Sequence, residues 1–155
     1  MHPVGAGPKE AAMNVKAILA AKGGDVISIE PTADLAAAAR LLGAHRIGAV
    51  VIRGAGGRLA GILSERDIVR AIAEQGAAAL TLPVGQIMTR NVATCSEDDS
   101  IASIMEQMTE GKFRHMPVLA KGELIGLVSI GDVVKHRVGE IEQESEAMRD
   151  YIRTA

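Results

Sequence analysis

The 155-residue chain has almost no aromatic side chains, since it holds one Phe, one Tyr and no Trp. Its core must therefore be aliphatic, and apolar residues, which make up 48% of the chain, are available to build it. The shortage also argues against nucleic-acid binding through stacked bases, because that mode needs several exposed rings. The composition predicts a globular protein with a core of Val, Ile, Leu, Met and Ala.

Other absences narrow the classes of function. Cys95 is the single cysteine, which excludes a disulfide framework and a cysteine-based metal site, and the four histidines lack the spacing of metal ligands. The net charge of −2 gives no overall field that would attract nucleic acid or an anionic membrane. No apolar run approaches about 18 residues, the length of a membrane span, and the first residues lack the order of a signal peptide. We expect a cytoplasmic protein that binds neither nucleic acid nor membrane.

The chain contains an internal duplication. Residues 57–69 resemble residues 122–134 at a constant offset of 65. The stretches 15–19 and 84–88 match at an offset of 69, and the slip falls in the Gly- and Lys-containing segment 21–24. Slips confined to loop-like segments are what a true duplication produces, so we read the chain as two copies of one unit.

Each copy predicts the same order of elements, strand-helix-strand-strand-helix. The first helix of each copy is apolar at three- and four-residue spacing, and the last helix begins near Asp67 or Asp132. The predicted fold class is therefore α/β (α+β), with two β-α-β-β-α repeats related by a pseudo-twofold axis and an extended C-terminal helix. The expected strands are 26–29, 49–52 and 59–63 in the first copy and 92–95, 116–119 and 124–128 in the second.

The duplication also predicts the domain organisation. One copy of about 60 residues buries too little surface to be stable alone, so the two copies are expected to pack together with paired, related sites in the cleft between them. The expected segments are a flexible lead-in at 1–12, repeats at 13–76 and 84–138, a linker at 77–83 and a helical extension at 139–155.

The paired pattern resembles a tandem of CBS domains, the regulatory module named after cystathionine β-synthase, of the stand-alone bacterial signal-transduction type. The resemblance covers about residues 13–138 and appears twice. It rests on the openings Ile18-Leu19 and Ile87-Met88-Thr89-Arg90-Asn91-Val92, on Phe113-Arg114-His115-Met116-Pro117-Val118, and on the endings Gly61…Ser64-Glu65-Arg66-Asp67 and Gly126…Ser129-Ile130-Gly131-Asp132.

The resemblance implies clefts for adenosine-containing ligands, namely AMP, ADP, ATP, NAD(H) or S-adenosylmethionine. In similar proteins the Asp of Ser-x-x-Asp accepts hydrogen bonds from both ribose hydroxyls, and a carboxylate has two oxygens to offer a vicinal diol. The Ser, at a helix start, is able to reach a phosphate, and the helix N-terminus favours that anion. The candidates here are Ser64 with Asp67, and Ser129 with Asp132.

The resemblance further implies that each adenine is contacted by residues of the opposite copy. For the Asp67 site these are Thr89, Ala93, Phe113 and the backbone of Arg114 and His115; for the Asp132 site they are Leu19, Ile27, Ile47 and Gly48. The expected phosphate partners are Arg66, Arg70, Arg114 and His115. Because the two copies differ in charge at matched positions, we expect one well-occupied site and one weak or empty site.

Structural explanations compete with several of these assignments. Asp67 and Asp132 are also suited to cap helices, and Arg66 and Arg70 to form a solvated helix face. His115 also suits an exposed strand end. The stretch 54–57 joins two strands without a following Gly-Lys-Ser/Thr, which favours a hairpin turn over a phosphate loop. The sequence shows no His and Asp placed to activate Cys95, so this thiol is expected to be inert.

The last predicted helix carries an apolar seam beyond the second repeat. Its members alternate at spacings of four and three residues, as in a coiled coil: Val134, Val138, Ile141, Ser145, Met148 and Ile152. The seam is expected to contribute to a homodimer, and packing back onto the same chain is the alternative.

The expected function is that of a regulatory sensor that binds an adenine nucleotide and signals by conformational change to a separate, unknown protein partner. No acid–base pair is placed for catalysis, so we expect no enzyme and no catalytic cofactor. The alternative function is a structural or stress-associated dimer whose ligand sites are vestigial.

Overall fold

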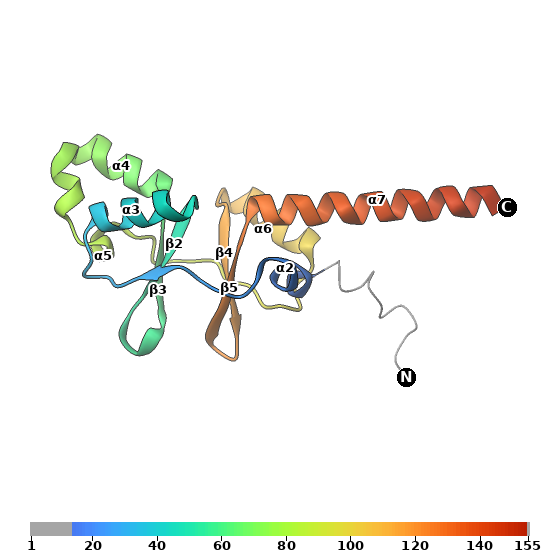
Figure 1. Cartoon of the computed structure of the whole chain (residues 1–155), viewed down its shortest axis with the longest axis horizontal. Helices are drawn as coiled ribbons and strands as arrows, with labels where there is room; N and C mark the ends of the chain where they lie inside the picture. Colours follow the sequence, from blue (N-terminus) through green and yellow to red (C-terminus); the bar gives the residue numbers. More distant parts are fainter. Residues whose placement is uncertain (1–13, 155) are drawn as a thin grey trace. The chain divides into compact units, whose positions relative to one another are not determined.

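The computed structural model describes residues 14–154 (Figure 1). The expected lead-in at 1–12 lies outside these residues. From the start of the described chain to the end of the first repeat, the elements are α2 (Val15–Lys22), β1 (Ser28–Ile29), α3 (Leu35–His45), β2 (Ala49–Arg53), the 3-10 turn η1 (Ala55–Gly57), β3 (Leu59–Ser64) and α4 (Glu65–Gln75). After the 3-10 segment η2 (Gly76–Thr81) follow α5 (Val84–Ile87), α6 (Ile101–Gly111), β4 (His115–Ala120), β5 (Glu123–Ser129) and α7 (Ile130–Thr154).

Polar side chains set the starts of α2, α3 and α6. The Asn14 side chain accepts a hydrogen bond from the backbone N–H of Ala17 at the start of α2, and Asp34 accepts one from Ala37 at the start of α3. Ser100 does the same for α6, where Ser103 donates at 3.1 Å. These caps satisfy N–H groups that have no partner inside the helix.

The first sheet has the order β1-β2-β3, with β1 parallel and β3 antiparallel to β2, and a second sheet pairs β4 with β5. The segment 54–57 is the turn between β2 and β3, which confirms the hairpin interpretation. The strand predicted at 26–29 shortens to two residues in β1.

The strand predicted at 92–95 is wrong. Only Cys95 forms a bridge there, to Val118, with Cys95 N–H donating to Pro117 O at 3.0 Å and Leu119 N–H donating to Cys95 O at 2.8 Å. Pro117 has no N–H, so the parallel ladder ends at this point. In the first repeat the residue at the matched position is Val51, whose N–H does donate, to Ile27 O at 3.2 Å.

The described chain divides into two compact units that cut across the sequence repeats. Unit 1 contains residues 14–24, 94–120 and 126–154, and unit 2 contains residues 25–93 and 121–125. The opening segment of each repeat therefore lies in the unit that carries the helical and strand residues of the other repeat. Periodicity in the sequence does not reveal this exchange, because it reports which face of an element is buried and not which neighbour buries it.

Matched hydrogen bonds hold the exchanged segments in place. In unit 1, the N–H groups of Val15 and Lys16 donate to the carbonyls of Asp99 and Glu97 at 2.9 and 3.0 Å. In unit 2, the equivalent N–H groups of Val84 and Gly85 donate to the carbonyls of Ala33 and Pro31 at 2.7 and 2.9 Å. The turn before the first long helix of each repeat thus anchors the opening segment of the other repeat.

Both units have aliphatic cores, as the composition predicts. In unit 2 the buried cluster includes Leu35, Leu42, Val50, Ile52 and Leu63. In unit 1 the fully buried side chains include Ile18, Ile101, Ile104, Met116 and Val118. The buried methionines fill space that aromatic rings occupy in other cores.

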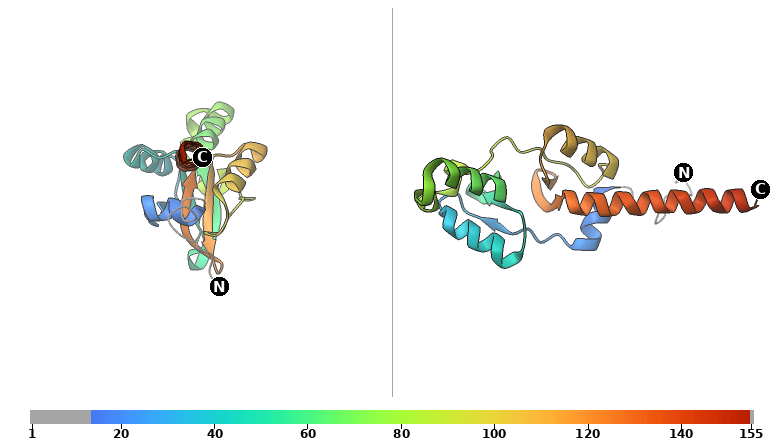
Figure 2. Two further views of the ribbon diagram at one scale, coloured as in Figure 1. Left: turned by 90° about the vertical axis from the view of Figure 1, so that its right-hand side faces the viewer. Right: turned by 90° about the horizontal axis from the view of Figure 1, so that it is seen from above.

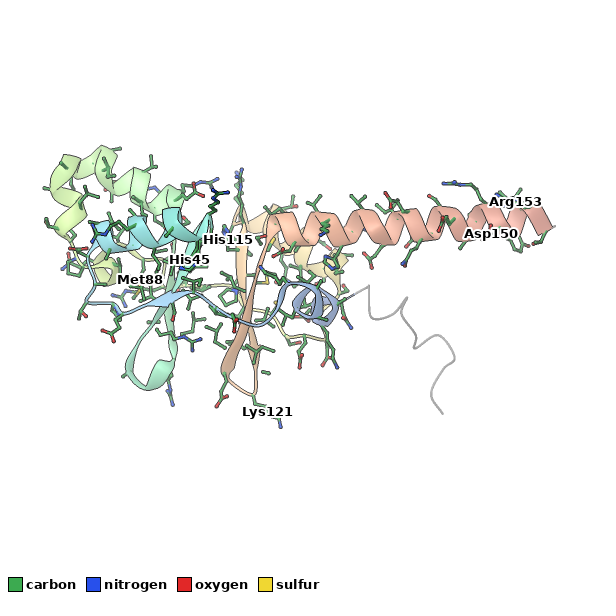
Figure 3. All side chains as sticks on the ribbon, in the orientation of Figure 1. His45, Met88, His115, Lys121, Asp150 and Arg153 are labelled. Carbon is green, nitrogen blue, oxygen red and sulfur yellow. The ribbon has the colours of Figure 1, made fainter. Side chains whose placement is uncertain are left out.

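Helix α7 packs against α6 and α2 over its first turns and then extends away from the rest of unit 1 (Figure 2). Glu140 is the last buried residue of the helix, at 4% exposure, and it pairs with Arg137 at 3.2 Å. Every described residue from 141 to 154 is exposed. Asp150 and Arg153, 3.8 Å apart, mark the far end (Figure 3). Within residues 14–154, no helix has the length and apolarity needed to span a membrane.

Candidate functional site

The first candidate site is built at the junction of β3 and α4. Ser64 is the N-cap of α4, and its Oγ accepts a hydrogen bond from the Asp67 N–H at 3.2 Å. The Asp67 carboxylate reaches back and accepts from the Ser64 N–H at 2.9 Å and from the Ser64 Oγ at 3.1 Å, both through Oδ2. This reciprocal arrangement is a capping box, so Asp67 does have the capping role that competes with ribose binding.

The second repeat reproduces this arrangement at the junction of β5 and α7. Asp132 N–H donates to Ser129 Oγ at 3.2 Å, and Asp132 Oδ2 accepts from the Ser129 N–H at 2.9 Å and from Ser129 Oγ at 3.0 Å. In both sites the contacts with Ser converge on Oδ2. The Oδ1 atom of each aspartate is therefore the oxygen that these boxes leave to other partners.

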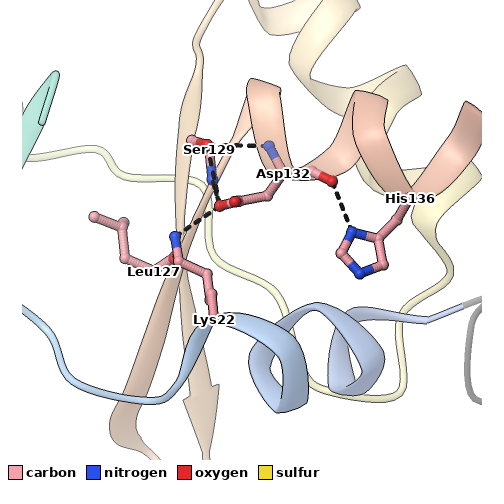
Figure 4. A network of polar contacts seen from close by, with 5 residues as sticks. All are labelled: Lys22, Leu127, Ser129, Asp132 and His136. Atoms are coloured by element: carbon pink, nitrogen blue, oxygen red, sulfur yellow. Dashed lines mark hydrogen bonds and ion pairs between the residues drawn. The ribbon is translucent and has the colours of Figure 1, made fainter.

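The two sites differ in the cation beside the carboxylate, and Figure 4 shows the Asp132 site with Lys22. Lys22, the last residue of α2, places its Nζ 2.6 Å from Asp132 Oδ2 and donates also to the Leu127 carbonyl at 2.9 Å. At Asp67 the cation is Arg70, whose Nη1 lies 3.8 Å from Oδ1 with the arginine side chain 61% exposed. Asp132 is thus part of a close ion pair, whereas Asp67 has a distant and solvated partner.

The environment of Asp132 determines the direction of its pKa shift. Burial is the largest single influence and raises the pKa of the carboxyl, but the hydrogen bond and charge of Lys22 and the hydrogen bonds from Ser129 act together in the opposite direction. The pKa of Asp132 consequently lies below the ordinary value of 3.8. His136 is close by, but its Nδ1 contacts the backbone carbonyl of Asp132 at 3.0 Å and not the carboxylate.

The residues predicted for the two adenine sites are divided between the units. Thr89 lies in the same unit as Asp67, bridged to Ile62 of β3, and Leu19 lies in the same unit as Asp132, where it packs on Gly126 of β5. The remaining assignments join residues of different units and stay predictions. In unit 2 these residues are Ile27, Ile47 and Gly48, and in unit 1 they are Phe113, Arg114 and His115, whereas Ala93, like Thr89, lies in the same unit as Asp67.

Backbone contacts bring two of these residues next to the helix starts of their own units. The Gly48 carbonyl accepts from the Glu65 N–H at 2.9 Å, and the Arg114 carbonyl accepts from the Ile130 N–H at 2.8 Å. Phe113 lies with its ring against Gly111. Arg66 and Arg114 have exposed side chains, while His115 is half-buried. Arg66 and Arg70 lie on the exposed face of α4, as the structural explanation predicts.

Unit 2 also has a groove of about 450 Å³ between α3 and α4. It includes Ile47 and Gly48, which were predicted to face adenine, together with Glu65 at the start of α4. Its other lining residues are Ala39, Leu42, Gly43, Arg46, Ile68 and Val69.

Lys22 is the site residue that the sequence did not reveal. It falls in the segment 21–24, which has no match in the second repeat and reads as a loop. In the structure Lys22 instead ends α2, and Gly23 follows it as the C-cap with φ of 90°. The cation in the opening segment of the second repeat, Arg90, donates to the Gly85 carbonyl at 2.9 Å. A cation is favourable in the last turn of a helix, so the position of Lys22 is the sequence signal that could have predicted a helix end there.

Cys95 has the environment of an inert thiol. It is 6% exposed, and its Sγ lies 3.8 Å from the Pro117 carbonyl. Burial, with a smaller contribution from the Asp99 charge, raises the pKa of the thiol to about 12. A thiol of this pKa stays protonated at neutral pH, which disfavours nucleophilic chemistry. Among residues 14–154 no group of three or more His, Cys, Asp or Glu side chains is placed to hold a metal ion.

Comparison with known proteins identifies the fold that carries these two boxes. The family model described as CBS domain matches residues 15–74 and 84–139. The chain belongs to the CBS domain family. The crystal structure of a CBS-domain containing protein, ATU1752 from Agrobacterium tumefaciens, is similar at 45% identity and a TM-score of 0.80, with 88% of this chain and 98% of that chain covered.

Two further comparisons bear on function. The CBS domain protein PAE2072 from Pyrobaculum aerophilum, solved in complex with AMP, matches at 32% identity and a TM-score of 0.64, covering 69% of this chain and 82% of that one. The mitochondrial CBS domain-containing protein CBSX3 of Arabidopsis thaliana is 38% identical over 113 residues, which is 70% of this chain. The chain spans only 55% of the length of that relative. CBS domain proteins of this kind are generally regulatory rather than catalytic.

Proposed function

We propose that the chain is a regulatory module whose two CBS repeats bind adenosine-containing ligands through Asp67 and Asp132. The observation that carries this proposal is the duplicated Ser–Asp box at the start of α4 and of α7, with matched distances in both copies. Two boxes at equivalent places in a CBS pair support a shared ligand role beyond capping. The AMP complex of a solved relative supports the ligand class.

The chemistry of each box suits the proposal. The Asp carboxylate is a hydrogen-bond acceptor for ribose hydroxyls, and the Ser Oγ rotates readily to donate to a phosphate instead of to Asp. The N-terminal ends of α4 and α7 add partial positive charge beside that phosphate. Nucleotide specificity is expected to come mainly from ribose and phosphate, since Phe113 is the single Phe of the chain and Tyr151 lies near the end of α7.

Isothermal titration calorimetry with AMP, ATP and NADH tests the proposal. We expect binding to the wild-type chain, and we expect Asp67→Ala and Asp132→Ala each to weaken one binding event at least tenfold. Asp99→Ala is the matched control, because Asp99 also accepts from the N–H of the serine three residues earlier, Ser96, at 2.9 Å, but outside the repeat endings. No binding of any of the three nucleotides at millimolar concentration would overturn the proposal and favour the alternative, a structural or stress-associated dimer with vestigial sites.

Signalling follows from ligand binding by a shift of population. A ligand with a tenfold difference in affinity between two arrangements of the chain biases them by about 1.4 kcal/mol. We propose that this bias is passed to a separate protein partner, and that the exposed seam of α7 joins two chains in a homodimer. The cytoplasmic location and the absence of enzymatic activity remain predictions from the sequence.

A further inference from the structure

Lys22 and Asp132 form the closest charged contact of the two candidate sites. The Lys22 ammonium lies 2.6 Å from Asp132 Oδ2, and the Leu127 carbonyl accepts a second hydrogen bond from it at 2.9 Å (Figure 4). The two side chains are 37% and 24% exposed. The contact is therefore fixed at two points, yet it is accessible from solvent.

This contact removes acceptor capacity that a ribose needs. Oδ2 of Asp132 already accepts from the Ser129 N–H and from Ser129 Oγ, and Lys22 is the third donor to the same atom. An ionised carboxylate has about four lone-pair positions on its two oxygens, so Oδ2 is fully used and Oδ1 alone remains. A ribose diol that is to engage both oxygens of Asp132 has to displace the ammonium.

The displaced ammonium then needs a new partner, and the ligand determines whether one is present. Adenosine brings no charge, so its binding leaves Lys22 without its carboxylate. AMP brings a phosphate, which is a strong acceptor for an ammonium ion. S-adenosylmethionine carries a sulfonium and an ammonium together with one carboxylate, so its net charge is positive and a neighbouring lysine repels it.

We infer that Lys22 is a specificity-determining residue of the Asp132 site. It pairs with the Asp132 carboxylate that is proposed to bind ribose, and it moves to the ligand phosphate when a nucleotide binds. This inference rests on the proposed function. It makes the Asp132 site selective for anionic adenine nucleotides over neutral or cationic adenosine compounds. The Asp67 site, whose cation is the exposed Arg70 at 3.8 Å, has no such competitor in close contact and is expected to discriminate less.

The experiment compares ligands at the Asp132 site in a chain whose other site is silenced by Asp67→Ala. Titration calorimetry with AMP, adenosine and S-adenosylmethionine gives three dissociation constants for Lys22 and three for Lys22→Met. With Lys22 present we expect AMP to bind at least tenfold more tightly than adenosine. In Lys22→Met we expect this ratio to fall below about threefold, with adenosine and S-adenosylmethionine gaining affinity and AMP losing it.

Two control variants separate charge from folding. Lys16→Met removes an exposed lysine from the same helix, away from the carboxylate, and is expected to leave the ratio unchanged. Lys22→Arg keeps the positive charge. It is expected to keep at least half of the difference in binding free energy between AMP and adenosine. Thermal melts of each variant show whether α2 still packs in unit 1.

The outcomes distinguish the inference from the function on which it rests. An unchanged ratio in Lys22→Met overturns the inference, as does an equal gain for all three ligands, which would make Lys22 a simple block. Absence of binding by every ligand to the wild-type chain overturns the proposed function together with the inference. If Lys22→Met does not fold, a loss of selectivity in Lys22→Gln or its retention decides the question in the same way.

Discussion

Met88 packs directly against the backbone of Gly61. A Cβ atom at position 61 would lie 2.7 Å from Met88 Sδ and 2.7 Å from the Thr89 carbonyl oxygen, closer than side-chain carbons approach other atoms. The Ile62 N–H donates to that same carbonyl at 3.0 Å, and Thr89 returns a hydrogen bond to Ile62 at 2.9 Å. The opening segment of the second repeat is thus joined to β3 of the first, and glycine is needed where they meet.

Replacing Gly61 by alanine is expected to destabilise the protein by about 1–3 kcal/mol, because the methyl group overlaps a backbone carbonyl that cannot turn away. Gly126→Ala, at the matched position of the second repeat, is expected to cost less, since the new methyl meets the flexible Leu19 side chain. Urea denaturation of both variants measures the difference. Equal losses for the two would contradict the assignment of the strain to the Thr89 carbonyl.

The repeat pattern made most of the fold predictable, because apolar spacing records which face of each element is buried. The Ser64–Asp67 and Ser129–Asp132 boxes were also visible, since Ser-x-x-Asp lies just before an apolar helix in both copies. The exchange of opening segments was hidden, since no local pattern says that Met88 packs on Gly61. The pairing of Lys22 with Asp132 was hidden too, because it joins residues 110 positions apart.

The Lys22–Asp132 pair predicts a pH dependence of stability. The folded-state pKa of Asp132 lies below its ordinary value of 3.8, so its contribution is fully present above that value and is lost as the pH falls through the folded-state pKa. Lys22→Met is expected to lower the stability by about 0.5–1 kcal/mol near pH 6, a small effect because both side chains are partly solvated.

The difference between wild type and Lys22→Met is expected to shrink steadily below pH 4 and to vanish once Asp132 is protonated in both. Urea unfolding at several pH values measures it, and NMR titration of the Asp132 carboxyl in Lys22→Met is expected to show a higher pKa than in the wild type. A constant difference between pH 2.5 and 6 would mean that Lys22 acts through packing alone.

Cys95 is expected to resist alkylation in the folded chain. Burial is the main cause of its pKa of about 12, so little thiolate forms at pH 8 and the sulfur is shielded as well. The rate of modification by iodoacetamide should rise at least a hundredfold in urea. Asp99→Asn removes only the smaller cause and is expected to change the native rate by less than tenfold. Fast modification of the native protein would contradict the burial of this thiol.

Lys112 adopts a left-handed backbone conformation at the C-terminus of α6, with φ of 57° and ψ of 38°. Glycine takes this conformation without a Cβ penalty, so Lys112→Gly is expected to stabilise the protein by about 0.5–1 kcal/mol. Lys135→Gly is the matched control, because Lys135 is exposed inside α7, where glycine costs about 1 kcal/mol. Thermal denaturation should therefore move in opposite directions for the two variants.

The seam of α7 is exposed along its length, with Val138 and Ile141 both 47%, Met148 59% and Ile152 66% accessible. Within residues 14–154 no element covers it, so the alternative of packing back onto the same chain is not what the structure shows. Ile141→Glu places a charge at the centre of the seam and is expected to weaken a homodimer at least tenfold, whereas Gln143→Glu adds the same charge beside the seam and is expected to leave it intact. Size-exclusion chromatography with light scattering over a range of concentrations measures both. A dimer unaffected by Ile141→Glu would assign the interface to another surface, and the exposed Val69 of α4, at 65%, would be the next position to test.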